Sequence, residues 1–360
     1  MKMIATTIVL LLSLIAAANG FSQEYSYTEA SDLTLVGKLM PDTPNPYHRV
    51  DTVRFKGFTP GENAQVRMSS GIAVAFRTDS KSIVIQTDFA VRNIRPNTTA
   101  FATCGYDLYI RKDGKWLWAA AGAQDAQKGS VLRLIGAMDG SMHECLLYLP
   151  IYSEESSIRI GTEKGAVIEP IGNPFRHRIA VLGSSYTHGI SISRAGMTYP
   201  AQLSRSTGLQ MLSLGCSGNC KLQDYFAAVL AEADVDAIIV DGFSNPSPDQ
   251  MRQRLFPFIE RIREGHPETP IIFQSTIYRE NRNFMTDKDS YEAEKMATAD
   301  SLMAIALRKY DNIHYIRPDA TDRNHETSQD GIHPGDHGYT LWAESIRKPL
   351  LRILRKYGIR

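Results

Sequence analysis

The chain has 360 residues, of which 43% are hydrophobic and 22% charged, an ordinary globular composition that excludes a disordered or fibrous protein. Lys and Arg number 40 and Asp and Glu 39, so the formal net charge of +1 gives no reason to expect nucleic acid or an anionic membrane as a partner. The length exceeds that of one typical domain and fits two.

The first 20 residues have the layout of a secretory signal peptide. Lys2 precedes an uncharged apolar run from Ile4 to Ala18, and the small residues Ala18 and Gly20 suit cleavage after Gly20. The run is shorter than the ~20 apolar residues that a spanning helix needs, which favours cleavage over a membrane anchor. We therefore expect a secreted or periplasmic protein with no stable membrane anchor after cleavage.

Four cysteines follow this segment: Cys104, Cys145, Cys216 and Cys220. An exported protein can oxidise them, and four cysteines allow three complete pairings between which the sequence does not choose. Bridges Cys104–Cys145 and Cys216–Cys220 would each stay within one half of the chain, and buried free thiols are the alternative. The spacing does not form the paired C-x-x-C hooks of a zinc site.

Residues 21–175 are predicted to form an all-β, jelly-roll-like sandwich domain. Short alternating runs lie at residues 52–55, 72–77, 82–87 and 146–149, with turn signals at Pro60-Gly61, Ser70-Gly71, Asp113-Gly114 and Asp139-Gly140. Short strands at regular spacing, separated by such turns, are typical of an antiparallel sandwich. Residues 106–110 and 116–118 flank Asp113-Gly114 and predict a hairpin.

Residues 176–360 are predicted to form a second domain of α/β class. Apolar strand candidates lie at residues 178–182, 211–214, 237–240, 271–274 and 313–316, and helical patterns lie near 198–207, 221–232, 248–265, 289–309 and 336–356. Continuous apolar strands that alternate with helices indicate a parallel sheet covered on both faces. Ligands of such folds bind at the carboxyl ends of the strands, so chemistry is expected directly after each strand.

The first strand of this domain runs into Gly183-Ser184-Ser185-Tyr186. A serine in a glycine-flanked turn between a strand and a helix is exposed, and its Oγ lies near helix N-terminal N–H groups, which suits a nucleophile. A serine-rich helix cap would give the same pattern.

The second and third strands are followed by residues that can donate hydrogen bonds to a ligand. Gly215 and Gly218 allow close backbone approach and leave an N–H free, and Asn245 can direct its side-chain amide at an oxyanion. Tight turns are the alternative interpretation of both segments.

Near the C-terminus, Asp330 and His333 have a D-x-x-H spacing that lets the carboxylate reach Nδ1–H of the imidazole. This contact would fix the tautomer and leave Nε2 free as a base. Metal binding is an alternative, because Asp322, His325, Asp336 and His337 lie in the same stretch. A metal site would leave the strand-end Ser and Asn without a role, which disfavours it.

Taken together, the four segments resemble the SGNH hydrolase (GDSL esterase/lipase) superfamily over residues ~176–360. Gly105-Tyr106-Asp107-Leu108-Tyr109 is similar to the GxDLY motif of a β-sandwich domain that precedes an exported bacterial subgroup of these hydrolases. The resemblance implies a flavodoxin-like three-layer catalytic domain that needs no metal or organic cofactor.

By the same resemblance, Ser185 is the nucleophile, His333 the general base and Asp330 the residue that orients His333. The oxyanion hole would consist of the N–H groups of Ser185 and Gly218 and the side chain of Asn245. The sequence departs from the family pattern at Ser184, where an Asp is usual, and around Asn245, which stands in Phe-Ser-Asn-Pro.

The subgroup resembles carbohydrate esterases that remove O-acetyl groups, so the expected substrate is an acylated carbohydrate with a short acyl group. A lipase or thioesterase with a longer acyl pocket, a catalytically silent carbohydrate-binding protein and a metal-dependent hydrolase are the alternatives.

Overall fold

The computed structural model describes residues 24–125, 127 and 129–360. The predicted signal peptide at residues 1–20 lies outside the described residues. No helix in the described part of the chain has the length and hydropathy that crossing a membrane requires.

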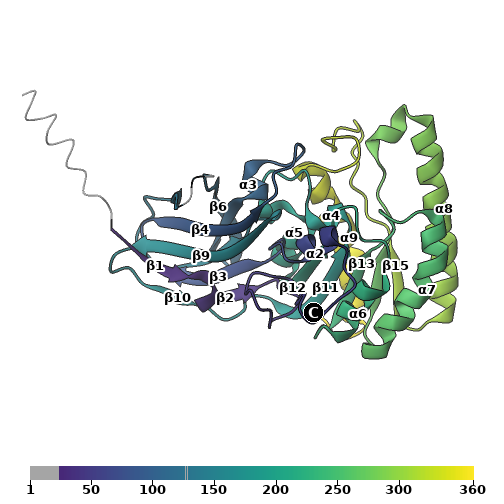
Figure 1. The fold of residues 1–360 in the computed structure, drawn as a ribbon, viewed down its shortest axis with the longest axis horizontal. Coiled ribbons are helices and arrows are strands. Elements are labelled where there is room, and N and C mark those ends of the chain that lie inside the picture. The colour runs from purple at the N-terminus through teal and green to yellow at the C-terminus, as the bar shows by residue number, and fades with distance from the viewer. Residues whose placement is uncertain (1–23, 126, 128) are drawn as a thin grey trace, which may run out of the picture.

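The N-terminal part consists of two antiparallel sheets (Figure 1). One sheet has the strand order β1 (Tyr25–Glu29), β9 (Ser153–Glu163), β4 (Ile83–Arg92) and β7 (Leu132–Ile135). The other has the order β10 (Ile168–Pro170), β3 (Ala73–Thr78), β8 (His143–Tyr148), β5 (Gly105–Lys112) and β6 (Lys115–Ala123), and β2 (Thr34–Val36) pairs with β3. Alternate residues of both sheets, among them Phe76, Ile85, Leu147 and Ile160, pack in one buried cluster, as in a β-sandwich.

The C-terminal part contains a five-stranded parallel sheet. Its strands are β11 (Arg176–Gly183), β12 (Leu209–Gly215), β13 (Ala237–Asp241), β14 (Ile271–Gln274) and β15 (Ile313–Ile316). They lie in the order β12-β11-β13-β14-β15, which is the flavodoxin-like order. The predicted α/β class is therefore confirmed, and the strand order reverses between β11 and β13, where ligands of such folds bind.

Helices cover both faces of this sheet because the strands are apolar on both faces. One face packs against α5 (Tyr199–Thr207) and α9 (Asp336–Arg355). The other packs against α6 (Asp224–Glu232), α7 (Pro248–Gly265) and α8 (Thr286–Lys309), and Figure 1 shows α8 at the edge of the molecule farthest from the sandwich. Alternate residues of β11 divide between the faces: Ile179 and Val181 belong to one core, Ala180 and Leu182 to the other.

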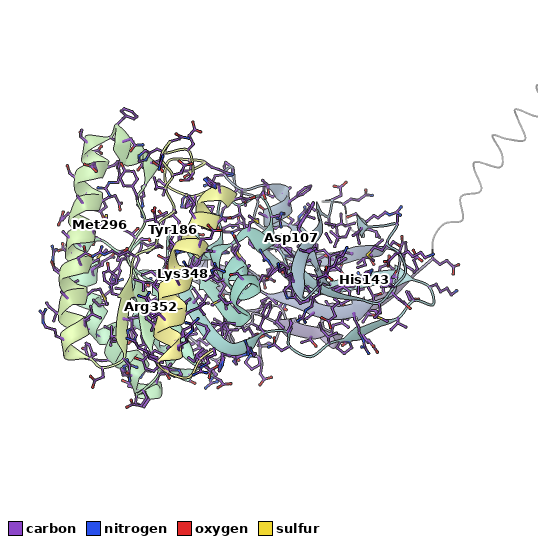
Figure 2. The ribbon with its side chains drawn as sticks, turned by 180° about the vertical axis from the view of Figure 1, so that it is seen from behind. Asp107, His143, Tyr186, Met296, Lys348 and Arg352 are labelled. Carbon is purple, nitrogen blue, oxygen red and sulfur yellow. The ribbon has the colours of Figure 1, made fainter. Side chains whose placement is uncertain are left out.

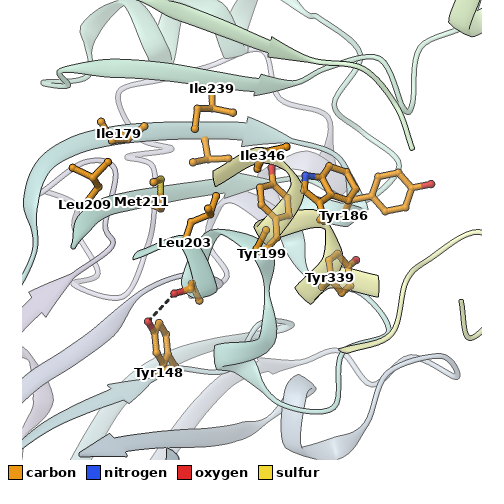
Figure 3. Packing of buried hydrophobic residues seen from close by; sticks show 14 of the residues in the cluster. Tyr148, Ile179, Tyr186, Tyr199, Leu203, Leu209, Met211, Ile239, Tyr339 and Ile346 are labelled. Atoms are coloured by element: carbon orange, nitrogen blue, oxygen red, sulfur yellow. Dashed lines mark hydrogen bonds between the residues drawn. The ribbon is translucent and has the colours of Figure 1, made fainter. Parts of the chain in front are cut away.

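The sandwich and the α/β part share one hydrophobic core. Tyr148 of the second sandwich sheet belongs to the same buried cluster as Leu203 of α5 and Met211 of β12 (Figure 3). Tyr109 of the same sheet also belongs to this cluster. The Tyr148 hydroxyl also donates a hydrogen bond to the carbonyl oxygen of Ala201 at 3.5 Å. A shared core of this kind fixes the sandwich relative to the carboxyl ends of the parallel strands.

Two local predictions in the sandwich are wrong. Residues 52–55 form a turn rather than a strand, because the Asp51 carboxylate accepts the N–H groups of Val53 at 2.8 Å and Arg54 at 3.1 Å. Pro60-Gly61 is not a turn but opens α2 (Pro60–Val66), where Thr59 and Glu62 form a capping box. A further short helix, α3 (Ala100–Thr103), precedes β5.

The four cysteines are free and buried. The structure therefore agrees with the prediction of buried free thiols, and neither Cys104–Cys145 nor Cys216–Cys220 forms a disulfide. Burial raises the pKa of Cys145 and of Cys216 to about 12, so both thiols stay protonated and unreactive at neutral pH.

The burial of Glu155, on β9, leads us to predict that the stability of the fold depends on pH. Glu155 is fully buried, accepts a hydrogen bond from Ser69 Oγ, and has no partner at Oε1 within the described residues. Burial raises its pKa to about 8, against the hydrogen bond from Ser69. Between the unfolded value of ~4.3 and about 8 the folded state binds the extra proton, so stability falls as the pH rises, by up to ~1.4 kcal/mol per pH unit.

Glu155→Gln is therefore expected to be more stable relative to wild type at pH 8 than at pH 5, measured as the midpoint of urea unfolding at both pH values. Other titrating groups cancel in the difference between the two proteins. The same change with pH in both proteins would contradict a buried, protonated Glu155.

Candidate active site

The nucleophile candidate lies in a sharp turn at the end of β11. Ser184 caps α4 (Ser185–His188) by accepting the N–H of Tyr186 at 3.2 Å, and Ser185 is the first helical residue, 6% exposed. Gly183 is required here because a Cβ would lie 1.9 Å from Oγ1 of Thr187. The turn thus holds Ser185 at the carboxyl end of the central strand.

A buried carboxylate at the end of β13 holds this turn in place. Asp241 Oδ2 accepts hydrogen bonds from Oγ of Ser184 at 2.8 Å and Oγ1 of Thr187 at 3.1 Å, and its Oδ1 accepts one from Oγ of Ser244 at 3.0 Å. Asp241 therefore connects the turn that carries Ser185 to the loop that carries Asn245. Burial raises the pKa of Asp241, although the hydrogen bonds from Ser184 and Ser244 oppose the shift.

Ser185, His333 and Asp330 form one hydrogen-bonded chain. Ser185 Oγ lies 2.9 Å from Nε2 of His333, and Nδ1 of the same ring lies 2.8 Å from Oδ2 of Asp330. The 317–335 loop that carries both residues is fixed by hydrogen bonds from Tyr186 and Ser328 to its carbonyl groups. This geometry lets Nε2 accept the Ser185 proton while Asp330 holds Nδ1–H.

The Asp330 carboxylate is strongly stabilised as an anion. Its Oδ1 accepts the backbone N–H groups of Ile332 at 2.9 Å and His333 at 2.8 Å. Partial burial would raise the pKa of Asp330, but hydrogen bonds from His333 and from Asn97 outweigh it and hold the pKa well below its usual range. Asp330 therefore stays ionised at any pH at which a neutral imidazole could act as a base.

Three hydrogen-bond donors without partners belong to residues that line one cavity. Within the described residues, no hydrogen bond is made by the backbone N–H of Ser185, the backbone N–H of Gly218 or the side-chain amide N–H of Asn245. All three residues line a cavity of about 390 Å³ together with His333. Gly218 reaches this position with φ +73°, and no atom lies within 4 Å of the place where a Cβ would stand. Free donors in the same cavity as a serine nucleophile are what a developing oxyanion requires.

Two cations, half-buried Arg279 and buried Lys295, support the loop that carries Asn245. The carbonyl oxygen of Ser244 accepts hydrogen bonds from Nη2 of Arg279 at 2.7 Å and Nζ of Lys295 at 2.8 Å. Glu292 Oε1 accepts a second hydrogen bond from each cation, at 2.7 and 3.4 Å. Burial, with the nearby charge of Arg279, lowers the pKa of Lys295 to about 8. The network fixes the peptide next to Asn245.

The segment between β2 and β3 supports the loop that carries Gly218. Fully buried Arg49 donates to the carbonyl oxygens of Ser213 at 3.3 Å and Gly215 at 3.1 Å. Gln65 of α2 donates to the Ser217 carbonyl at 3.0 Å. One oxyanion donor is thus positioned by residues outside the α/β part.

The GxDLY motif joins the two parts at a third place. Asp107 is fully buried. Figure 2 shows it between His143 of the sandwich and the α/β part. Its Oδ2 accepts Nη1 of Arg194 at 2.7 Å and the N–H of Gly196 at 2.8 Å, both in the segment after α4. Trp118 Nε1 donates to its other oxygen at 3.1 Å. The motif thereby fixes the chain that follows the Ser185 turn.

All five predicted site residues meet at one place: four line the cavity, and Asp330 reaches it through His333. The sequence analysis missed Asp241 and Asn97. A signal existed for Asp241, an acid directly after a buried apolar strand, but none existed for Asn97.

The residues of the metal alternative do not converge. His325 pairs with Glu280 at 2.6 Å, His337 with Asp322 at 3.3 Å, and Asp336 bonds Ser193. In residues 24–125, 127 and 129–360, no group of three or more His, Cys, Asp or Glu side chains is placed to hold a metal ion.

Comparison with known proteins defines the class. Residues 176–351 match the GDSL-like lipase/acylhydrolase family, and residues 25–168 match the GxDLY domain found at the N-terminus of SGNH-hydrolase-type esterases. The chain belongs to this SGNH hydrolase family and is a carboxylic ester hydrolase. No curated protein sequence matches the chain.

Several solved structures resemble that of this chain. A protein described as a GDSL-like lipase, from Bacteroides ovatus, is 36% identical, with a TM-score of 0.87 over 92% of this chain and 98% of its own. A salicylyl-acyltransferase of a tetracycline biosynthetic pathway shares the fold at 21% identity, with a TM-score of 0.69 over 93% and 99%. A family two carbohydrate esterase from Cellvibrio japonicus does so at 13% identity, with a TM-score of 0.61 over 92% and 98%.

The junction at Asp107 predicts a large loss of stability for Asp107→Ala. The substitution leaves the buried Gly196 N–H without its acceptor, and it removes the carboxylate partner of half-buried Arg194, which keeps only the Tyr109 hydroxyl as an acceptor within the described residues. Removing the buried partner of such a pair costs ~3 kcal/mol. The measurement is the apparent free energy of unfolding from urea titration.

Asp88→Ala is the matched control, because it also removes an Asp–Arg pair at 2.9 Å, with Arg159, but on the surface of the sandwich. Its expected loss is within ~1 kcal/mol. Equal losses for both variants would show that Asp107 does not join the two parts.

Proposed function

We propose that this enzyme is an exported serine esterase that removes short acyl groups, acetyl above all, from carbohydrate through an acyl-enzyme on Ser185. The observation that carries the proposal is the 2.9 Å contact between Ser185 Oγ and His333 Nε2 beside three unpaired hydrogen-bond donors. A base in contact with a hydroxyl and an oxyanion site in the same cavity serve acyl transfer.

In the first half of the reaction, His333 Nε2 takes the proton of Ser185 as Oγ forms a bond to the ester carbonyl carbon. The carbonyl oxygen becomes an anion held by the N–H groups of Ser185 and Gly218 and the amide of Asn245. When the oxyanion collapses, the C–O bond to the alcohol breaks, and His333 returns the proton to the leaving alcohol oxygen.

In the second half, water takes the place of the alcohol. His333 removes a proton from the water as its oxygen attacks the acyl carbon, and Ser185 Oγ leaves with the proton that His333 returns. Asp330 stabilises the imidazolium in both halves and is not itself protonated.

The cavity lining supports a short acyl group. Around Ser185 it contains three cations, Arg95, Arg279 and Lys295, and only Ile190 and Ile332 are aliphatic. A long acyl chain would need a continuous apolar channel to replace the water that it loses, whereas an acetyl group buries little surface.

A carbohydrate substrate is supported by an exposed aromatic residue in the cavity lining and by the fold shared with a carbohydrate esterase. Tyr291 lines the cavity and is 44% exposed, so part of its ring is accessible for stacking against a sugar. Export rests on the signal-peptide layout of residues 1–20.

Ser185→Ala is expected to lower kcat/KM for p-nitrophenyl acetate by at least ~10³-fold, because the nucleophile is removed and only oxyanion and substrate binding remain. The comparison uses p-nitrophenyl esters of increasing chain length, with acetate as the best substrate of the wild type.

Ser141→Ala, in an exposed turn of the sandwich, is the control and should keep wild-type rates. Hydrolysis by Ser185→Ala at the wild-type rate would remove Ser185 from the reaction. A preference for long acyl chains would leave the mechanism intact and contradict the acetyl assignment.

A further inference from the structure

Arg95 differs from the other two cations of the cavity because its side chain has no hydrogen-bond acceptor within the described residues. Arg279 and Lys295 both donate to Glu292 and to the Ser244 carbonyl. Within the described residues the Arg95 guanidinium forms no ion pair and no hydrogen bond, and its Nε is buried without a partner. Arg95 is only partly buried and lines the cavity, so its unpaired N–H donors can bind an acceptor that a ligand supplies.

The position of this guanidinium is fixed by the sandwich. It lies over the ring of Tyr152, 5.0 Å from the centroid, and the Tyr152 hydroxyl is hydrogen-bonded to Ser217, next to Gly218. The loop that follows β4 is tied to the α/β part by Thr99 Oγ1, which donates to the Ser193 carbonyl at 2.5 Å. Arg95 is thus held at the wall of the cavity that contains Ser185.

We propose that Arg95 is a binding site for an anionic substituent of the substrate, so that the preferred ester is an O-acetyl group on a negatively charged sugar. The inference rests on the proposed esterase function. The charge belongs to the sugar rather than to the acyl group, because an acetyl group carries none. A guanidinium binds carboxylate or sulfate through paired N–H donors, and both substituents occur on acidic sugars.

The test uses matched substrates that differ only in charge. One pair is an acetylated oligogalacturonide and its methyl ester, and the other is an acetylated sulfated oligosaccharide and its desulfated form. Wild-type kcat/KM should be higher for the charged member of at least one pair. Arg95→Gln should lower that charged-to-neutral ratio by about tenfold or more, since a charged hydrogen bond is lost.

Two variants control for folding and for net charge. Arg95→Lys keeps the charge and should keep part of the preference. Arg111→Gln removes a different arginine, on β5 and paired with Glu144 at 3.1 Å, and should leave the ratio unchanged. Wild-type enzyme that does not prefer either charged substrate, or a ratio that Arg95→Gln does not change, overturns the anionic site. Failure to hydrolyse p-nitrophenyl acetate would instead count against the esterase itself.

A second, independent observation concerns Asn97, in the same loop of the sandwich. Its Nδ2 donates to Oδ2 of Asp330 at 2.8 Å, across a sequence separation of 233 residues. The same oxygen accepts Nδ1 of His333. The other donors to Asp330 come from its own loop, so Asn97 is its contact with the sandwich.

We infer that Asn97 is a positioning residue for the Asp330 carboxylate. Its amide holds Oδ2 toward the imidazole and stabilises the ionised form. Removing it should weaken the base without changing substrate contacts, so Asn97→Ala should lower kcat by ~10-fold and change KM little.

Asn97→Asp separates this role from a merely structural one. At neutral pH it places a second carboxylate against Asp330, and two adjacent carboxylates tend to share one proton. Activity should fall below that of Asn97→Ala at pH 8. It should recover relative to Asn97→Ala as the pH falls, because the introduced carboxyl group, once protonated, can donate as the amide did. The effect of imidazole protonation is common to both variants and cancels in their ratio.

The measurement is kcat and KM of each variant from pH 5 to 8, with thermal midpoints to verify folding. An Asn97→Ala variant with wild-type kcat, or a ratio of the two variants that does not depend on pH, would overturn the positioning role.

Discussion

The buried Asp241 carboxylate is the contact on which the geometry of the site depends. It stands at the end of the strand beside β11 and accepts hydroxyl groups from Ser184, Thr187 and Ser244. A parallel sheet brings strand ends to one edge but does not fix the loops beyond them. One carboxylate that binds two loops at once converts that proximity into a fixed distance between Ser185 and Asn245, and a fixed distance is what a preorganised oxyanion site needs.

The sandwich acts as a second scaffold of the same site. Arg49 fixes the strand that leads to Gly218, Asp107 fixes the segment after the Ser185 turn, and Asn97 contacts Asp330. Each contact reaches a different segment of the α/β part. The shared core around Tyr148 holds the two parts of the chain in a fixed relative position, so that these contacts can form. Catalytic groups on loops need such external support, because loops lack the ladder of hydrogen bonds that makes strands rigid.

The sequence predicted what depends on local pattern and strand order. Apolar runs identified every strand of the parallel sheet, and the resemblance of the loop motifs to those of the SGNH hydrolases paired Ser185 with His333, whose side chains lie 2.9 Å apart in the structure. Contacts between distant loops, such as Asn97 with Asp330, left no local signal. Pro60-Gly61 was misjudged because proline before glycine suits both a turn and the first turn of a helix, and only the capping box at Thr59 distinguishes them.

Some hydrogen-bond donors around the cavity have no acceptor within the described residues. Some buried polar groups outside the cavity, such as Arg49 and Asp107, have several partners each, whereas others, such as Glu155 Oε1, have none within the described residues. Around the cavity, the N–H groups of Ser185 and Gly218 have none within the described chain. Unsatisfied donors reduce stability, so the rest of the fold must hold them in place. Because those donors are in place before the ester carbonyl binds, little reorganisation accompanies the growth of negative charge on its oxygen. The unpaired donors thus lower the stability of the free enzyme and also lower the activation free energy of the reaction.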